Sequence, residues 1–154
     1  LDIAPVAYPS RHDAVFSALN AVRDARVGSR SEARAIMQPL LEDIRIADFL
    51  LTSAHISSEG YVHWRFNLNG LRIGYESLLG AISARCGGAK QFSGPTLVVR
   101  GELSDYVTDE SARAFPPLFS SFDMVTVRGA GHWLHQEEPV AVSAAVRQFF
   151  DAEI

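Results

Sequence analysis

The sequence predicts an α/β protein in which a mainly helical segment precedes a short parallel sheet with flanking helices. Residues 11–85 carry apolar side chains at helical spacing, whereas residues 96–99 and 122–127 are short runs rich in β-branched side chains. A helical pattern follows each run, and right-handed connections in such an order place both strands side by side in one parallel sheet. Because two strands alone make a poor sheet, we expect its other strands to lie outside this chain.

The first helices are predicted from spacing and from their end signals. Apolar residues recur at intervals of four and three near the start of the segment, at Val15, Leu19 and Val22. Gly28 ends this helix, and Ser29 with Glu32 three residues later has the spacing of a capping box that opens a second one. Pro39 should kink or restart the second helix, because proline lacks the N–H group that a helical turn requires.

Three further elements complete the helical segment. Residues 44–53 predict a short helix, and residues 61–66 alternate aromatic and polar types as in a short strand or extended arm. Residues 71–84 return to helical spacing. The composition changes at Cys86 and the two glycines after it, so we expect a new segment to begin there.

The second segment is predicted to alternate strands and helices. The continuous apolar run of residues 96–99 is typical of a strand buried on both faces. Residues 108–119 suit a helix that ends near Pro116-Pro117, and residues 122–127 form the second strand.

The last predicted helix begins at Pro139. Glu137 and Glu138 precede it, where the positive end of the helix dipole favours acidic side chains.

Composition excludes several classes of protein. The 154 residues include 18 acidic and 14 basic side chains, for a net charge of -4, and without a run of Lys or Arg we expect no nucleic acid as a partner. No apolar stretch approaches the roughly 20 residues of a membrane span, so we expect no membrane association. A single cysteine, Cys86, and the lack of a secretion signal favour the cytoplasm. The first residue is not Met, so we expect a piece of a longer protein.

The strongest chemical signal is a histidine directly after the second predicted strand. His132 follows the turn Gly129-Ala130-Gly131. Loops at the carboxyl ends of parallel strands form the active-site crevice of open α/β sheets, so His132 is a candidate general base. Alternatively, it caps the following helix or packs on Trp133. His132 and His135 could together bind a metal ion, but a third soft ligand is lacking, so we expect no metal. We also expect no organic cofactor.

Asp105 supplies a second signal, because it follows the first predicted strand. A carboxylate at this place can accept a hydrogen bond from His132 and stabilise its protonated form. Alternatively, Asp105 is a turn residue or a helix cap, for which Ser104-Asp105 is also suited.

Together these motifs resemble the C-terminal half of an α/β-hydrolase-fold serine esterase. The resemblance rests on the loop from Gly101 to Asp105, on Gly-Ala-Gly-His-Trp at residues 129–133 with its trailing Glu-Glu-Pro, and on the helical insertion before them. The opening Asp-Ile-Ala-Pro-Val of residues 2–6, together with residues 64–68, narrows it to small acyl esterases of the bacterial YbfF type.

The resemblance implies three parts. Residues 1–7 would be the end of a core strand and an acid-bearing loop, residues 8–85 a helical cap, and residues 86–154 the C-terminal core. We expect Tyr61, Trp64 and Trp133 to bind substrate, although aromatic packing between cap and sheet is an equal alternative.

The family's nucleophilic serine lies in a Gly-x-Ser-x-Gly turn upstream of the acid and the histidine. No such pentapeptide occurs in this chain, and the segment from Gly74 to Gly80 has the wrong spacing. We therefore expect the serine on an N-terminal segment of the same protein, roughly 90–110 residues long. The resemblance then implies an esterase or thioesterase that cleaves small acyl substrates through an acyl-enzyme, with the isolated chain inactive. A non-catalytic module that binds a ligand or a partner is the alternative.

Two aspartates compete to orient His132. Asp105 follows the penultimate strand, the commoner place for the acid in this fold. Asp2 opens the Asp-Ile-Ala-Pro-Val motif at the end of the strand that precedes the penultimate one, where some esterases of this type have their triad acid. The resemblance slightly favours Asp2, and the sequence leaves both open.

Overall fold

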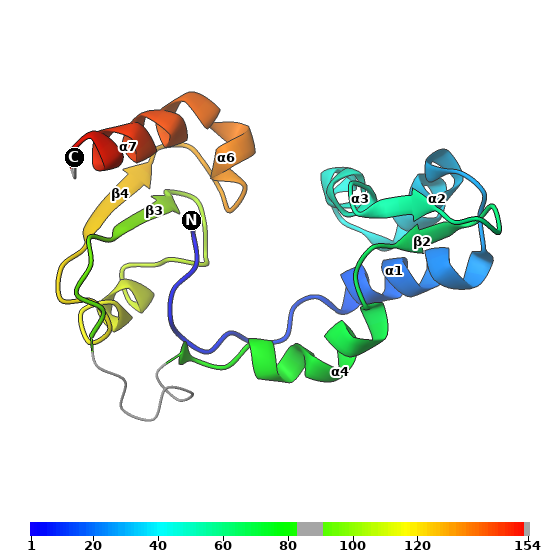
Figure 1. The fold of residues 1–154 in the computed structure, drawn as a ribbon, viewed down its shortest axis with the longest axis horizontal. Helices are drawn as coiled ribbons and strands as arrows, with labels where there is room; N and C mark the ends of the chain where they lie inside the picture. The colour runs from blue at the N-terminus through cyan, green and yellow to red at the C-terminus, as the bar shows by residue number, and fades with distance from the viewer. Residues whose placement is uncertain (83–90, 153–154) are drawn as a thin grey trace. The chain divides into compact units, whose positions relative to one another are not determined.

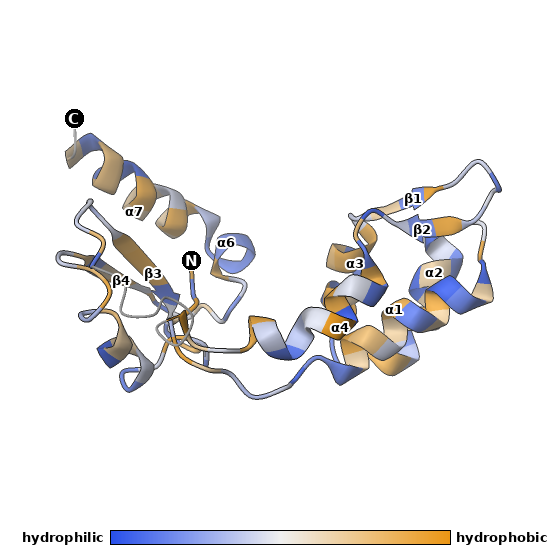
Figure 2. Ribbon diagram, turned by 60° about the horizontal axis from the view of Figure 1, so that its bottom comes forward, coloured by the Kyte–Doolittle hydropathy of each residue, from blue (hydrophilic) through white to orange (hydrophobic). Residues whose placement is uncertain are grey.

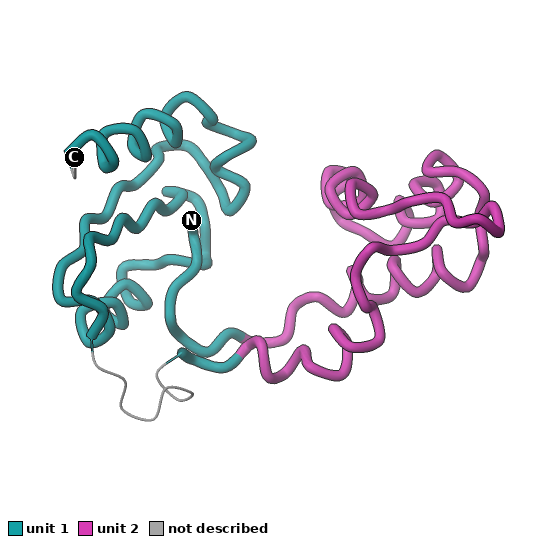
Figure 3. Tube along the Cα trace, viewed as in Figure 1, with its two compact units in different colours: residues 1–8, 80–154 teal, residues 9–79 magenta. Residues whose placement is uncertain are grey.

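The computed structural model describes residues 1–82 and 91–152 and divides the chain into two compact units (Figure 3). The helical unit is Pro9–Leu79, and the sheet unit combines Leu1–Tyr8 with Gly80–Ile154. The change of segment expected after residue 85 falls outside the described residues, as does Cys86, so that boundary stays a prediction.

The helical unit begins with α1 (Asp13–Ala25), α2 (Arg30–Met37), the short 3-10 helix η1 (Gln38–Leu40) and α3 (Ile44–Leu51). These elements confirm the predicted helices. The Ser29 hydroxyl accepts the N–H of Glu32 at 3.2 Å, as expected of a cap, and the Glu32 carboxylate accepts the N–H of Gly28 at 3.1 Å. Pro39 lies in η1, where the α-helix gives way to a tighter turn, so the predicted break is also confirmed.

A hairpin and one more helix complete this unit. Strand β2 (Val62–Trp64) was predicted, whereas its antiparallel partner β1 (Ala54–Ile56) is too short to show a pattern. Helix α4 (Leu68–Leu78) begins three residues before the predicted start, because the Asn67 side chain accepts the N–H of Gly70 at 2.9 Å and caps it there. It also ends earlier than predicted, two residues before Gly80.

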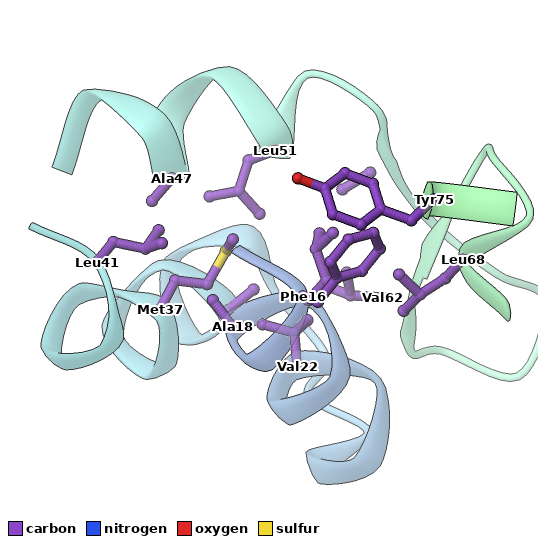
Figure 4. Close-up of a cluster of buried hydrophobic side chains, with 13 residues drawn as sticks. Phe16, Ala18, Val22, Met37, Leu41, Ala47, Leu51, Val62, Leu68 and Tyr75 are labelled. Carbon is purple, nitrogen blue, oxygen red and sulfur yellow. The ribbon is translucent and has the colours of Figure 1, made fainter. Parts of the chain in front are cut away.

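Buried apolar side chains from the four α-helices and both strands of this unit, with Leu41 just after η1, form one core (Figure 4). Hydrophobic and hydrophilic residues both occur along α1 (Figure 2), and the buried ones face this core. The rings of Phe16 and Tyr75 meet edge to face, with centroids 5.1 Å apart, and Met37 is fully buried. Burial of an apolar face, rather than helix propensity, therefore holds these short helices in place.

The sheet unit contains the predicted parallel pair. Strands β3 (Leu97–Gly101) and β4 (Asp123–Val127) lie side by side with Leu97 opposite Asp123, and α6 (Leu134–Glu137) and α7 (Pro139–Ala152) follow (Figure 1). Val98 and Val99 are both buried, in different apolar clusters. Since successive side chains of a strand point to opposite faces, β3 is covered on both faces, as predicted.

The helix predicted over residues 108–119 is wrong. Only the 3-10 helix η2 (Ser111–Ala114) forms, with turns around it. The Thr108 N–H donates to the Ser111 hydroxyl at 2.9 Å, and the Ser111 N–H donates to the Thr108 hydroxyl at 3.1 Å. These side-chain bonds compete with helical ones, and Pro116-Pro117 removes two N–H donors. Within residues 1–82 and 91–152, no helix is long and apolar enough to cross a membrane.

Candidate active site

The N-terminal residues run beside strand β3 and bring a carboxylate to the end of the sheet. The Asp2 N–H donates to the Val99 carbonyl at 2.7 Å. Asp2 has a left-handed backbone with φ of 44°, a conformation that Asp adopts more readily than most residues. Its side chain is fully buried, so it needs hydrogen-bond donors around it.

Three donors surround that carboxylate. Oδ1 of Asp2 accepts the N–H of Gly101 at 3.0 Å, and Oδ2 accepts the Ser104 hydroxyl. Nδ1 of His132 lies 2.9 Å from the same Oδ2. A carboxylate can only accept, so Nδ1 carries the proton and Nε2 is the free basic nitrogen of the neutral ring.

The imidazole is also fixed on its face. The Tyr106 ring stacks on His132 with centroids 3.7 Å apart and planes 17° apart. Hydrogen bonds also hold the Tyr106 backbone, whose N–H donates to the Ser104 hydroxyl at 3.2 Å and whose carbonyl accepts the Tyr8 hydroxyl at 2.7 Å. The His132 side chain is 40% exposed, so one side of the ring remains accessible while Asp2 is closed off.

A close contact between two loops places these groups together. A Cβ atom on Gly101 would lie 2.2 Å from the Gly131 carbonyl oxygen, so only glycine fits at the end of β3. Two residues later, the Leu103 N–H donates to the Ala130 carbonyl at 2.9 Å. The loop after β3 therefore lies directly against the loop that carries His132.

The structure thus brings together two predicted residues, Asp2 and His132. Asp105 is exposed in the loop after β3, and His135 is exposed in α6. Trp133 is half-buried at the start of α6, and the ring that stacks on His132 is that of Tyr106.

Sequence reasoning missed two members of this site. It treated Ser104 only as a turn residue and gave Tyr106 no role. Their spacing at the carboxyl end of a buried strand is the signal that could have found them.

The other two predicted substrate-binding residues, Tyr61 and Trp64, belong to the helical unit. They line a cavity of about 550 Å³ within it. The Arg26 guanidinium lies 4.3 Å from the centroid of the Tyr61 ring, and Trp64 stacks on Phe66 and donates its Nε1–H to the Leu19 carbonyl at 3.1 Å. Their role toward a substrate stays a prediction.

The described residues contain no group of three or more His, Cys, Asp or Glu side chains that could hold a metal ion.

Comparison with known proteins identifies relatives over nearly the whole chain. No protein-family profile matches it. It is 34% identical over 152 residues to the esterase YbfF of Escherichia coli, covering 98% of this chain and 56% of that protein. It is 30% identical over 155 residues to an sn-1-specific diacylglycerol lipase of Mus musculus, covering 97% of this chain and 49% of the lipase. The chain spans about half the length of these curated relatives.

A solved structure has a similar fold. A marine microorganism esterase superimposes with a TM-score of 0.84 at 25% identity, covering 96% of this chain and 58% of that one. The fold is therefore part of an α/β-hydrolase fold, as the sequence predicts.

Proposed function

Since this chain is a homologue of α/β-hydrolase esterases of the YbfF type, we propose that the complete protein is a serine esterase. It would hydrolyse a carboxylic ester or thioester through an acyl-enzyme. The observation that carries the proposal is the 2.9 Å contact between the buried Asp2 carboxylate and Nδ1 of the half-exposed His132. This pair is the acid and base of a Ser-His-Asp triad.

In this mechanism His132 moves the proton and Asp2 keeps its charge. Nε2 of His132 takes the proton of a serine hydroxyl as the serine oxygen bonds to the acyl carbon. The bond to the leaving group breaks as His132 returns the proton to it, and water then releases the acyl group by the same two steps. Asp2 holds the Nδ1–H tautomer and stabilises the imidazolium, and the Ser104 hydroxyl and Gly101 N–H hold Asp2.

The serine is proposed to lie on an N-terminal segment of the same protein. The chain contains no Gly-x-Ser-x-Gly sequence, and it spans about half of its curated relatives. The donors of the oxyanion hole come from the residue after the nucleophile and from an earlier loop in this fold, so they belong to the same segment. On this proposal the isolated chain is inactive.

The remaining parts of the proposal concern the substrate. Residues 8–85 would form a cap over the acyl group, and Tyr61, Trp64 and Trp133 would contact it. The names of the relatives, an esterase and a diacylglycerol lipase, support an acyl ester as the substrate class.

The test uses the complete protein and a fluorophosphonate probe, which labels only an activated serine, together with hydrolysis of p-nitrophenyl esters. His132→Ala should abolish labelling and lower kcat by about a thousandfold or more, since binding and the oxyanion hole alone would remain. His135→Ala, three residues away and exposed, is the matched control and should change kcat by less than about threefold.

Two outcomes would contradict the proposal. An unlabelled wild-type protein would favour a non-catalytic binding module, and equal losses from both histidine variants would indicate a structural or metal-binding role.

A further inference from the structure

Two glutamates outside the triad hold the loop that carries His132. The Gly131 N–H, directly before His132, donates to Oε2 of Glu137 at 2.6 Å. The Gly129 N–H donates to Oε2 of Glu102 at 2.8 Å. Hydrogen bonds from backbone N–H groups to carboxylates are shorter and stronger than neutral ones. Each side of this tight turn is therefore tied to a separate charged acceptor.

We propose that Glu137 and Glu102 are positioning residues for His132, and that Glu137 has the larger effect. They act by fixing the loop, and through it the contact between Nδ1 of His132 and Asp2. Their catalytic consequence rests on the proposed esterase function, whereas their effect on the position of the imidazole does not.

The reach of Glu137 explains its larger effect. Its carboxylate accepts a hydrogen bond from the N–H of Gly131, six residues earlier, and His132 lies within the segment that this bond closes. Helix α6 holds the other end, since the Glu137 N–H donates to the Trp133 carbonyl at 3.0 Å and Leu134 is fully buried. Glu137 is thus anchored at its backbone and bonded at its side chain, on either side of the histidine. The sequence had suggested only a favourable interaction with the dipole of the following helix.

Glu102 bonds to the loop two residues further from His132, at Gly129 rather than Gly131. It extends from the end of β3, where its own N–H donates to the Val127 carbonyl at 3.0 Å. The left-handed φ of 70° at Gly129 turns the chain at this point. Glu102 therefore orients the start of the turn, and Glu137 orients the peptide that leads into His132.

The test compares Glu137→Ala, Glu137→Gln and Glu138→Ala in the complete protein. Glu138 is the matched control, because it is the exposed neighbour in sequence and no hydrogen bond joins its side chain to the described loop. Glu137→Ala should lower kcat by about 10- to 100-fold with KM within about twofold, the usual consequence of a misplaced catalytic group. Glu137→Gln should recover most of this loss, because its amide oxygen still accepts from Gly131. Glu102→Ala should lower kcat less, with Glu110→Ala as its control.

A second readout does not depend on hydrolysis. The proton on Nδ1 of His132 gives a downfield NMR resonance that is assigned by its loss in His132→Ala. Glu137→Ala should shift or broaden this resonance, while Glu138→Ala and Glu137→Gln leave it in place. If the wild-type protein hydrolysed no ester, the proposed function would fail and this resonance would still decide the positioning role.

The inference is overturned if Glu137→Ala leaves both kcat and the resonance unchanged. It is also overturned if Glu137→Gln loses as much as Glu137→Ala, because an acceptor at this position would then be irrelevant. The melting temperature of each variant is measured beside its kinetics. If Glu137→Ala does not fold, it is replaced by the Gln variant and by Glu137→Asp, whose side chain is one methylene shorter. The Asp variant should then show an intermediate loss of kcat, and wild-type kcat in it would count against the proposal.

Discussion

Replacing Asp2 with Asn removes one charge from the proposed triad and little else. Asn has the same shape and also tolerates the left-handed φ of 44°. Its carbonyl oxygen can still accept from the Gly101 N–H. Its amide nitrogen, however, takes the place of the oxygen that both Ser104 and His132 contact. The substitution therefore affects the side of Asp2 that faces the imidazole.

The expected losses follow from these contacts. A hydrogen bond to a charged group contributes about 1.5–3 kcal/mol, against about 0.5–1.5 kcal/mol for a neutral one, so weakening two such bonds should lower stability by about 2 kcal/mol. Catalysis should suffer more, because the wrong tautomer of His132 is favoured and the imidazolium loses its counter-charge. A loss in kcat of about 10³- to 10⁴-fold is expected, which corresponds to about 4–5.5 kcal/mol in the barrier.

The assay is steady-state hydrolysis of a p-nitrophenyl ester by the complete protein, with urea unfolding of the same samples. Asp105→Asn is the matched control, because Asp105 is exposed in the neighbouring loop. It should change kcat by less than about fivefold and leave the unfolding midpoint nearly unchanged. A larger loss for Asp105→Asn than for Asp2→Asn would refute the assignment of Asp2 as the acid.

Two further substitutions test the fold around the site and the helical unit. Gly101→Ala would place a Cβ atom 2.2 Å from the Gly131 carbonyl oxygen and should lower the stability by about 1–3 kcal/mol. Gly74→Ala in α4, whose Cβ would meet no described atom outside its own helix within 4 Å, should instead raise it by about 0.5–1 kcal/mol. Equal melting temperatures for these two variants would contradict the close contact between the loops. The Arg34 guanidinium donates a hydrogen bond to the Asp48 carboxylate at 2.6 Å and lowers the pKa of that carboxyl. This exposed pair therefore stabilises the fold at a pH above the ordinary pKa of Asp, and its contribution is lost as the pH falls through the lowered pKa. The urea concentration at the unfolding midpoint should therefore fall less steeply in Asp48→Asn than in the wild type as the pH is lowered from about 6 to about 2. The same fall in both proteins would disprove this contribution.

Elements defined by neighbouring residues were predictable from the sequence alone. The spacing of Val15, Leu19 and Val22 predicted α1, and Ser29 predicted the start of α2, because helix formation and capping depend on groups one turn apart. The two short runs rich in β-branched side chains predicted the parallel pair of β3 and β4 for a similar reason, since the residue pattern and the order of the elements can both be read along the chain.

Predictions failed where local groups compete or no local pattern exists. The segment of residues 108–119 has helix-compatible spacing, yet hydrogen bonds between Thr108 and Ser111 close a turn instead. Strand β1 pairs with β2, and its three residues carry too little pattern of their own to indicate it.

In the candidate site, too, one residue could be predicted from its neighbours in the sequence and the other could not. The glycine turn and the preceding strand placed His132 at the end of the sheet, because loop and strand are adjacent in sequence. The choice between Asp2 and Asp105 stayed open, since Asp2 lies 130 residues from His132 and no periodicity connects positions so far apart. Only the tertiary structure, which packs the N-terminal residues against β3, brings the buried Asp2 carboxylate to the imidazole and surrounds it with the Gly101 N–H and the Ser104 hydroxyl.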